Sequence, residues 1–133
     1  MHFLLETSPG DFLDKLTILE IKSERITDPA KLANVRHELE LLRRRWHEAG
    51  IERESVTLLV AELKTVNGTL WEIEDRIREC EAAKRFDAGF VELARAVYIT
   101  NDRRAAIKRR LNESLGSTLI EEKSYSDYGG PGA

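Results

Sequence analysis

The chain has 133 residues, of which 41% are hydrophobic and 34% are charged, and its formal net charge is −3. This length supports one domain with its own core, and the composition is typical of a soluble, helix-rich protein. The negative charge argues against general binding to nucleic acids or anionic membranes, which both favour a basic surplus. The single cysteine excludes an internal disulfide and fits a reducing cytoplasm.

The N-terminal residues MHFLLETSPG lack both a cationic start and a long apolar run, so we expect no signal peptide. No apolar run approaches the ~18 residues of a membrane span. We therefore expect a cytoplasmic protein that does not enter a membrane. A single helical domain is predicted at 1–128, followed by a disordered, glycine-rich tail at 129–133.

Two helices are predicted in the first fifty residues. Ser8 and Pro9 are typical of a helix start, and the helix should end just before Asp28. Asp28 and Pro29 repeat this signal, and Gly50 closes the second helix as its C-cap. The short break predicts an antiparallel hairpin. The apolar positions of the second helix alternate in steps of three and four, as in a coiled coil: Leu32, Val35, Leu39, Leu42, Trp46 and Ala49.

Two longer helices follow, from near Ser55 to about Lys84 and from Asp87 to Gly116. Each would span roughly 45 Å at 1.5 Å per residue. The predicted fold is therefore all-α, an elongated bundle of four main helices in two antiparallel hairpins, which could extend to meet a second subunit. The end segments HFLLET and TLIEEKSY could pair as a short β-ribbon, which needs helices to pack on.

Polar residues fall on the faces that should be buried. The face of Val97 continues through three polar residues of the last helix before the apolar pattern resumes. The same count places acids or amides on the inner faces of the first and third helices. The resulting candidate ligand-binding residues are Glu20, Glu24, Asn67, Trp71, Glu74, Asn101, Arg104 and Lys108.

Two interpretations of these residues stay open, besides an error in helix phase, which drifts by ~20° per heptad. The acids and bases could satisfy one another in a buried network that fixes the register of the helices. Alternatively, Arg104 and Lys108 could receive an anionic ligand in a cleft while Glu20 and Glu74 orient or protonate it. No catalytic residue and no cofactor can be assigned, and no metal site is expected. Cys80 lies in an apolar helical pattern and is interpreted as an inert core thiol.

Four long motifs resemble a family of small, uncharacterised bacterial proteins, a domain of unknown function. They are LDKLTILEIKSERITDPAKLANVR, WEIEDRIRECE, VYITNDRRAAIKRRLN and LIEEKSY, and the likeness extends from Gly10 to Tyr125. This resemblance implies a stand-alone domain that can occur near polysaccharide and glycosyltransferase genes. It implies no catalytic residue.

Two enzyme families are resembled more faintly. The segments DPAKLANVRHE and FDAGFVELARAVYITNDRR look somewhat like all-helical chorismate mutases, which would give cationic roles to Lys15, Lys22, Arg25 and Arg36. The long helix between the two segments has no counterpart in that family. The segment EIED looks like half of the magnesium site of all-helical nucleotide pyrophosphohydrolases, with Glu72 and Asp75, but the E-x-x-E that should accompany it is absent.

The sequence therefore predicts a non-catalytic protein-interaction module, homodimeric and cytoplasmic, which binds an unidentified partner protein. The resemblance adds an accessory role in polysaccharide or glycan biosynthesis. The alternative is an enzyme that binds a small anion at a polar site in the middle of the bundle.

Overall fold

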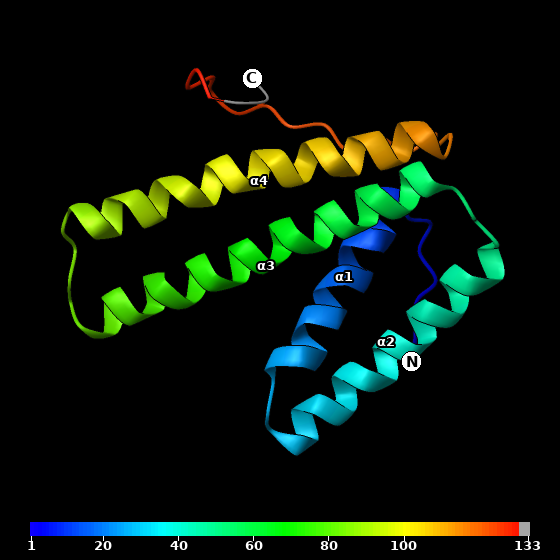
Figure 1. Cartoon of the computed structure of the whole chain (residues 1–133), viewed down its shortest axis with the longest axis horizontal. Coiled ribbons are helices and arrows are strands. Elements are labelled where there is room, and N and C mark those ends of the chain that lie inside the picture. Colours follow the sequence, from blue (N-terminus) through cyan, green and yellow to red (C-terminus); the bar gives the residue numbers. More distant parts are fainter. Residues whose placement is uncertain (131–133) are drawn as a thin grey trace.

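The computed structural model describes residues 1–130, which form four helices and no strand (Figure 1). They are α1 (Pro9–Arg25), α2 (Pro29–Ala49), α3 (Glu54–Ala82) and α4 (Ala88–Ser114). Helices α1 and α2 form one antiparallel hairpin, and α3 and α4 form a second, longer one. The predicted all-α fold and both of its hairpins are thereby confirmed.

The predicted caps explain where the helices begin and end. The Ser8 hydroxyl accepts a hydrogen bond from the backbone N–H of Asp11 at 3.1 Å, and the Asp28 carboxylate accepts one from Lys31 at 2.9 Å. These bonds satisfy backbone donors that the first turn of a helix leaves without partners. Helix α2 ends at Gly50, whose φ of 62° lies in the left-handed region that favours glycine.

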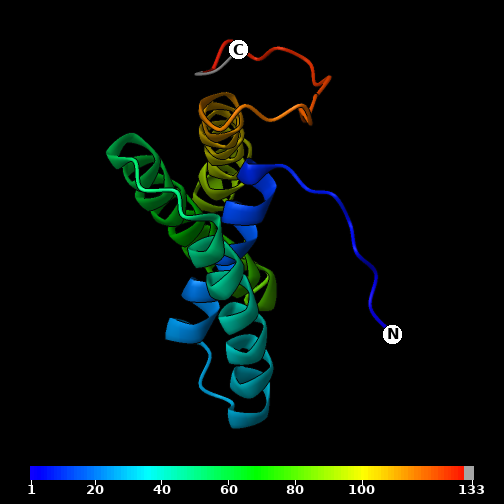
Figure 2. The same cartoon turned by 90° about the vertical axis from the view of Figure 1, so that its right-hand side faces the viewer.

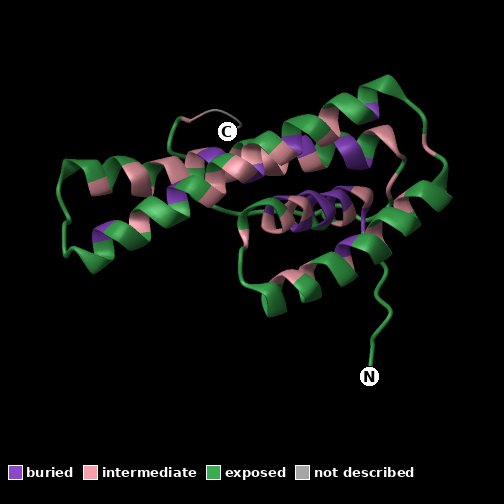
Figure 3. Ribbon diagram, turned by 60° about the horizontal axis from the view of Figure 1, so that its bottom comes forward, coloured by how far each residue is buried: buried purple, intermediate pink, exposed green. Residues whose placement is uncertain are grey.

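Helix α1 is the centre of the fold. It packs against each of the other three helices, whereas α2 packs against α1 alone. One side of α1 meets α2, where Leu16 and Leu19 pack on Leu39. The opposite side meets the long hairpin, and buried residues gather along α1 as a result (Figure 3). The core on the hairpin side consists of Leu13, Val56, Leu63, Ile107 and Leu111.

The long hairpin projects well beyond α1 (Figure 1). In this projecting half, α3 and α4 have only each other to pack against, with Ile73 and Cys80 buried between them. Cys80 is 1% exposed, as expected for a core thiol. The chain exposes 9599 Å², about a third more than the roughly 7,100 Å² expected of a compact monomer of 15.2 kDa. The exposed end segments, 1–7 and 118–129, and the projecting hairpin both contribute to this excess.

The N-terminus of α1 lies very close to α4. The backbone N–H of Gly10 donates to the side-chain oxygen of Asn112 at 2.7 Å. A Cβ at position 10 would lie 2.6 Å from the backbone oxygen of Lys108, closer than atoms tolerate. Glycine is therefore required here by a contact between two helices, since only a residue without a side chain fits.

The two end segments do not form the ribbon that the sequence allowed, because they leave the helices in different directions (Figure 2). Residues 1–7 form an extended arm without helical support. The C-terminal segment instead runs back along α4, where the Tyr128 ring lies 5.0 Å from that of Tyr98. Of the tail predicted at 129–133, residues 131–133 lie outside the described residues. Within residues 1–130, no helix combines the length and apolarity that a membrane crossing requires.

Candidate functional site

A buried ion pair joins α1 to α4 in the middle of the molecule. The Asp14 side chain is 8% exposed and faces Arg104, whose side chain is 30% exposed. The Arg104 Nε donates to Asp14 Oδ1 at 2.8 Å, and Nη2 donates to Oδ2. A guanidinium that binds both oxygens of a carboxylate fixes distance and angle together. This pair therefore sets the register of α4 against α1.

Helix α3 completes the cluster through an amide. The Nδ2 of Asn67 donates to Asp14 Oδ1 at 3.0 Å and approaches the hydroxyl of Thr17 at 3.1 Å. The Thr17 hydroxyl itself donates to the backbone oxygen of Asp14 at 2.9 Å. All three helices that surround the cluster thus contribute a side chain. Among the described residues, no buried side-chain nitrogen or oxygen is left without a partner.

The electrostatic balance keeps Asp14 ionised. Burial by itself would raise the pKa of Asp14, but the hydrogen bonds from Arg104 and Asn67 and the positive charge of Arg104 outweigh it. The pKa of Asp14 therefore lies below its ordinary value of 3.8. The hydrogen bonds to Asp14 likewise raise the pKa of Arg104. The cluster is an ion pair whose hydrogen-bonding groups are satisfied. Replacing one partner of such a pair destabilises the fold, because the other charge is left buried without compensation.

Lys108 lies one turn further along α4 and has its own partners. Its Nζ lies 2.9 Å from Asp11 Oδ1 and 2.9 Å from Glu121 Oε2, while its side chain is only 13% exposed. Burial would lower the pKa of Lys108, but the hydrogen bonds to the two carboxylates raise it above its ordinary value of 10.5. Lys108 thus links α1 and the C-terminal segment to α4.

The structure brings together only part of the predicted site. Asn67 and Arg104 are in the cluster, and Asn101 accepts a long contact of 3.5 Å from Arg104 Nη1. Glu20 lies on the other side of α1, where its carboxylate is 3.2 Å from Arg43 of α2. The reason is its position four residues after Leu16, which places it on the face toward α2.

The remaining acids also have other partners. Glu24 lies 2.5 Å from Lys64 of α3, and Glu74 lies 3.9 Å from Arg78 one turn along its own helix. Neither forms an ion pair with Arg104. The expected convergence of Glu20, Glu74 and Arg104 on one point is not found.

Asp14 and Thr17 are members of the cluster that the sequence analysis did not identify. The phase count followed the stripe of Leu16 and Leu19, which faces α2. Asp14, Thr17 and Ile21 recur at steps of three and four and form a second stripe, and the structure shows that all three are buried. A helix that packs on two sides has two inner faces, and the carboxylate that meets Arg104 lies on the second.

Beside the cluster, the surface forms a groove of about 340 Å³. We call it the lateral groove. Most of its lining residues come from α1 and α3, which diverge in this part of the molecule (Figure 1). Its apolar wall is formed by Ile18, Leu70 and Trp71, and Asn67 and Arg104 belong to both the groove and the cluster. Four of the eight predicted residues therefore line one hollow. The full lining is Ile18, Lys22, Asn67, Leu70, Trp71, Glu74, Asp75, Arg78 and Arg104.

The residues that resemble enzyme sites are dispersed. Lys22 lines the lateral groove, whereas Arg25 and Arg36 line two other hollows. Glu72 is 3.3 Å from Arg25 rather than beside a second acidic pair. Within residues 1–130, no three acidic, histidine or cysteine side chains are grouped as metal ligands would be.

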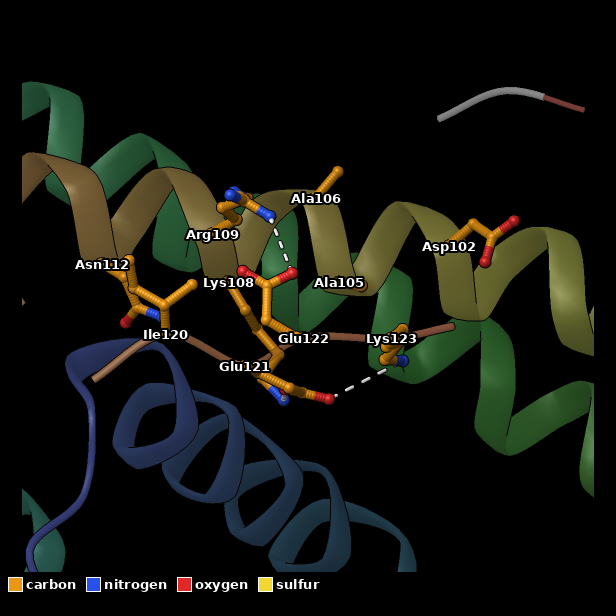
Figure 4. A pocket seen from close by; sticks show the side chains of 10 residues that line it. All are labelled: Asp102, Ala105, Ala106, Lys108, Arg109, Asn112, Ile120, Glu121, Glu122 and Lys123. Carbon is orange, nitrogen blue, oxygen red and sulfur yellow. Dashed lines mark hydrogen bonds and ion pairs between the residues drawn. The ribbon is translucent and has the colours of Figure 1, made fainter. Parts of the chain in front are cut away.

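A smaller hollow of about 260 Å³ lies between α4 and the C-terminal segment (Figure 4). Figure 4 shows Glu121 and Glu122 reaching from this segment toward the bases of α4. The Arg109 guanidinium is 3.9 Å from Glu122, and Lys123 is 3.8 Å from Glu121. Each charge that lines the hollow thus has a partner nearby. The ion pairs of Glu121 and Glu122 with bases of α4 hold the C-terminal segment along this helix.

Comparison with known proteins gives one match. The model of a family of unknown function (DUF6165) matches residues 3–130. No curated protein and no solved structure matches the chain.

Proposed function

The chain belongs to this family of unknown function, and we propose that it is a non-catalytic protein-interaction module that binds a helical segment of a partner protein. The observation that carries the proposal is the lateral groove. It has an apolar wall, it lies where α1 diverges from the hairpin, and no helix of the described chain covers it.

The lining of the groove suits an amphipathic helix. On α3 it runs from Asn67 to Arg78, with lining residues at successive steps of three and four. This strip is roughly 16 Å long at 1.5 Å per residue, or about three helical turns. Grooves of this kind bind a helix through apolar residues spaced at i, i+3 or i+4, and i+7. Trp71 and Leu70 would provide the apolar contact.

The charges around the groove would give the partner its orientation. Lys22 and Arg104 lie on the side of α1 and α4. Glu74 and Asp75 lie on α3, where Arg78 pairs with Glu74 at 3.9 Å and leaves this side with one net negative charge. A helix with acidic residues on one flank and basic residues on the other complements this arrangement. Charge complementarity of this kind selects partners and sets register more than it raises affinity. Of the predicted site residues, Asn67, Trp71, Glu74 and Arg104 are thus proposed as the ones that contact the partner.

The satisfied cluster supports a non-catalytic role. Arg104 donates to both oxygens of the Asp14 carboxylate, and Asn67 donates a second hydrogen bond to Oδ1. A catalytic acid or base has to exchange a proton near the working pH. Asp14 has a lowered pKa and Arg104 a raised one, so both shifts move away from neutrality.

We further propose that the protein is a cytoplasmic homodimer. The surface of 9599 Å² exceeds that of a compact monomer by more than the roughly 800 Å² per partner that a standard interface buries. The resemblance described above makes an enzyme of glycan biosynthesis the first partner to examine.

The test compares two substitutions on α3. Trp71→Glu places a charge in the lateral groove, and Leu58→Glu places the same charge at a residue that is 62% exposed and outside the groove. We expect a partner that co-purifies with the wild type and with Leu58→Glu, but not with Trp71→Glu. The purified partner should bind the wild type and Leu58→Glu with similar affinity and Trp71→Glu much more weakly. A partner retained by Trp71→Glu at full strength contradicts the proposal, provided that both variants melt as the wild type does.

Binding of a small anion in the same groove is the second candidate function. It is favoured by Lys22, which lines the groove and forms no ion pair among residues 1–130. Thermal shifts with sugar nucleotides, nucleotides with magnesium, and dicarboxylates distinguish the two. A ligand at a hundred times its dissociation constant adds roughly 2.7 kcal/mol to the free energy of unfolding. If the wild type shows such a gain in stability and Lys22→Met does not, the lateral groove binds a small anion rather than a partner helix.

A further inference from the structure

A second groove lies at the opposite end of α1, where the loop between α2 and α3 passes the start of α1. It measures about 440 Å³. We call it the end groove. Its apolar lining is Phe12, Trp46, Ala49, Ile51 and Leu115, and Arg45 and Arg53 stand among these residues. Among the described residues that line it, none is acidic. The end groove is therefore apolar with two positive charges, of which Arg45 also lies 3.4 Å from Glu48 and Arg53 forms no ion pair among the described residues.

The N-terminal arm, residues 1–7, has the complementary character. Phe3 is 88% exposed, Leu4 is 101% exposed and Leu5 is 86% exposed, so three consecutive large apolar side chains contact almost nothing. Glu6 follows them and carries the negative charge of the arm. A contiguous apolar stretch left in water marks a contact site. The family model matches from residue 3 onward, so these side chains belong to the matched sequence.

We propose that the arm of one chain binds in the end groove of a second copy, and that the exchange of two arms forms the homodimer. Phe3, Leu4 and Leu5 would cover the apolar lining, while Glu6 would approach Arg45 and Arg53. This inference rests on the proposed function, since it specifies how the proposed homodimer assembles.

The direction of the arm favours a second copy over the chain's own groove. Thr7 and Ser8 line the end groove, so the arm departs from its edge. Ser8 is extended, with φ of −71° and ψ of 155°, and the arm runs away from the helices (Figure 2). To enter its own groove, the chain would have to reverse between Glu6 and Ser8. A second copy receives the arm in the direction that it already takes.

Reciprocal exchange is also a closed arrangement. Two copies related by a twofold axis each give one arm and receive one, so no groove and no arm is left free to recruit a third copy. Seven extended residues reach about 23 Å, which is twice the width of a helix. The arm is thus long enough to lie across the end of α2 in the other subunit. The surface that the chain exposes beyond that of a compact monomer is larger than the area that each partner buries in a standard interface.

Sedimentation equilibrium of the full chain gives the first test. We expect a mass of twice 15.2 kDa. The arm variant Phe3→Ser/Leu4→Ser/Leu5→Ser and the groove variant Ala49→Glu should each raise the dimer dissociation constant by roughly tenfold or more, as loss of interface anchors does. Ala33→Glu is the matched control, because it adds the same charge to an exposed alanine of α2 outside the end groove. It should leave the dimer unchanged.

Mixing the two variants gives the decisive test. The groove variant still carries an intact arm, and the arm variant still carries an intact end groove. An equimolar mixture should therefore form a heterodimer held by one arm–groove contact, and this heterodimer should be tighter than the homodimer of either variant. Circular dichroism confirms that both are folded, which the exposed positions of the substituted side chains favour.

The other outcomes separate the inference from the proposed function. A dimer that neither variant weakens overturns the arm exchange and leaves the homodimer to another face. A wild type that stays monomeric overturns both the arm exchange and the homodimer. Partner binding in the lateral groove is unaffected by either result, because Trp71 and Leu70 lie outside the end groove.

Discussion

Asp14 of α1 and Arg104 of α4 stand 90 residues apart in the chain and form a two-point ion pair in the middle of the molecule. Arg104 binds both carboxylate oxygens, and Asn67 of α3 binds one of them as well. Three helices therefore depend on one carboxylate for their relative position.

We expect Arg104→Met to lower the free energy of unfolding by roughly 3–5 kcal/mol, because it leaves Asp14 buried without its countercharge. The double variant Asp14→Leu/Arg104→Met should lose less than the sum of the two single variants, since no charge then stays buried. Urea denaturation measures all three. Arg103→Met is the control, because Arg103 is exposed and forms no ion pair among the described residues. Additive losses in the double variant would contradict the interpretation.

The stability should also depend on acid in a defined direction. The pKa of Asp14 is lower in the folded protein than its ordinary value of 3.8, so folding favours the ionised form. This contribution is fully present above the ordinary value and is lost as the pH falls through the folded pKa. The free energies of unfolding of the wild type and Asp14→Asn should therefore differ above pH 3.8 and approach each other as the pH falls below it, because protonation removes the charge that the variant lacks. A gap that stays constant down to the acid limit would exclude this linkage.

Two glycines on different helices should respond oppositely to alanine. Gly10→Ala should destabilise the protein, because its Cβ would meet the Lys108 backbone at 2.6 Å and disturb the bond to Asn112. Gly68→Ala should stabilise it by up to about 1 kcal/mol, because Gly68 lies inside α3 with nothing within 4 Å of the added atom. Thermal melts of both variants give the comparison. Equal effects would mean that α1 and α4 are not in close contact.

The position of the C-terminal segment on α4 can be tested through the titration of the Tyr128 phenol. A hydrogen bond to Asp102 raises the pKa of Tyr128 to about 12. The ultraviolet absorbance of the phenolate should therefore show one tyrosine that titrates late, and Asp102→Asn should bring its pKa back toward the ordinary 10.0. If the late titration persists in Asp102→Asn, the C-terminal segment does not lie on α4 as described.

Much of the fold was predictable because the signals were local. Ser8, Asp28 and Asp87 cap the helices that were predicted to begin at them, and Gly50 ends α2 as predicted. The periodicity also identified Asn67 and Arg104 as inward polar residues. These features depend on a few neighbouring residues, so one sequence was enough to locate them.

The partner of Arg104 was not predictable in the same way. Glu20 lies in the apolar sector of α1 that faces α2, and only the packing of α1 on two sides shows that Asp14 lies toward α4. The projection of the hairpin past α1 is likewise a property of how the helices assemble. The lateral groove and the end groove depend on that assembly, so the spacing of residues within one helix did not reveal them.

Helix α2 has one further consequence for the molecule. It touches no helix except α1, and Leu39 is its one buried residue. Regions with few buried contacts open without global unfolding. We therefore expect α2 to be the first helix to detach, while α3 and α4 keep their structure. Such an opening would expose Leu16 and Leu19, which pack on Leu39 of α2 in the closed structure, as an apolar strip on the central helix.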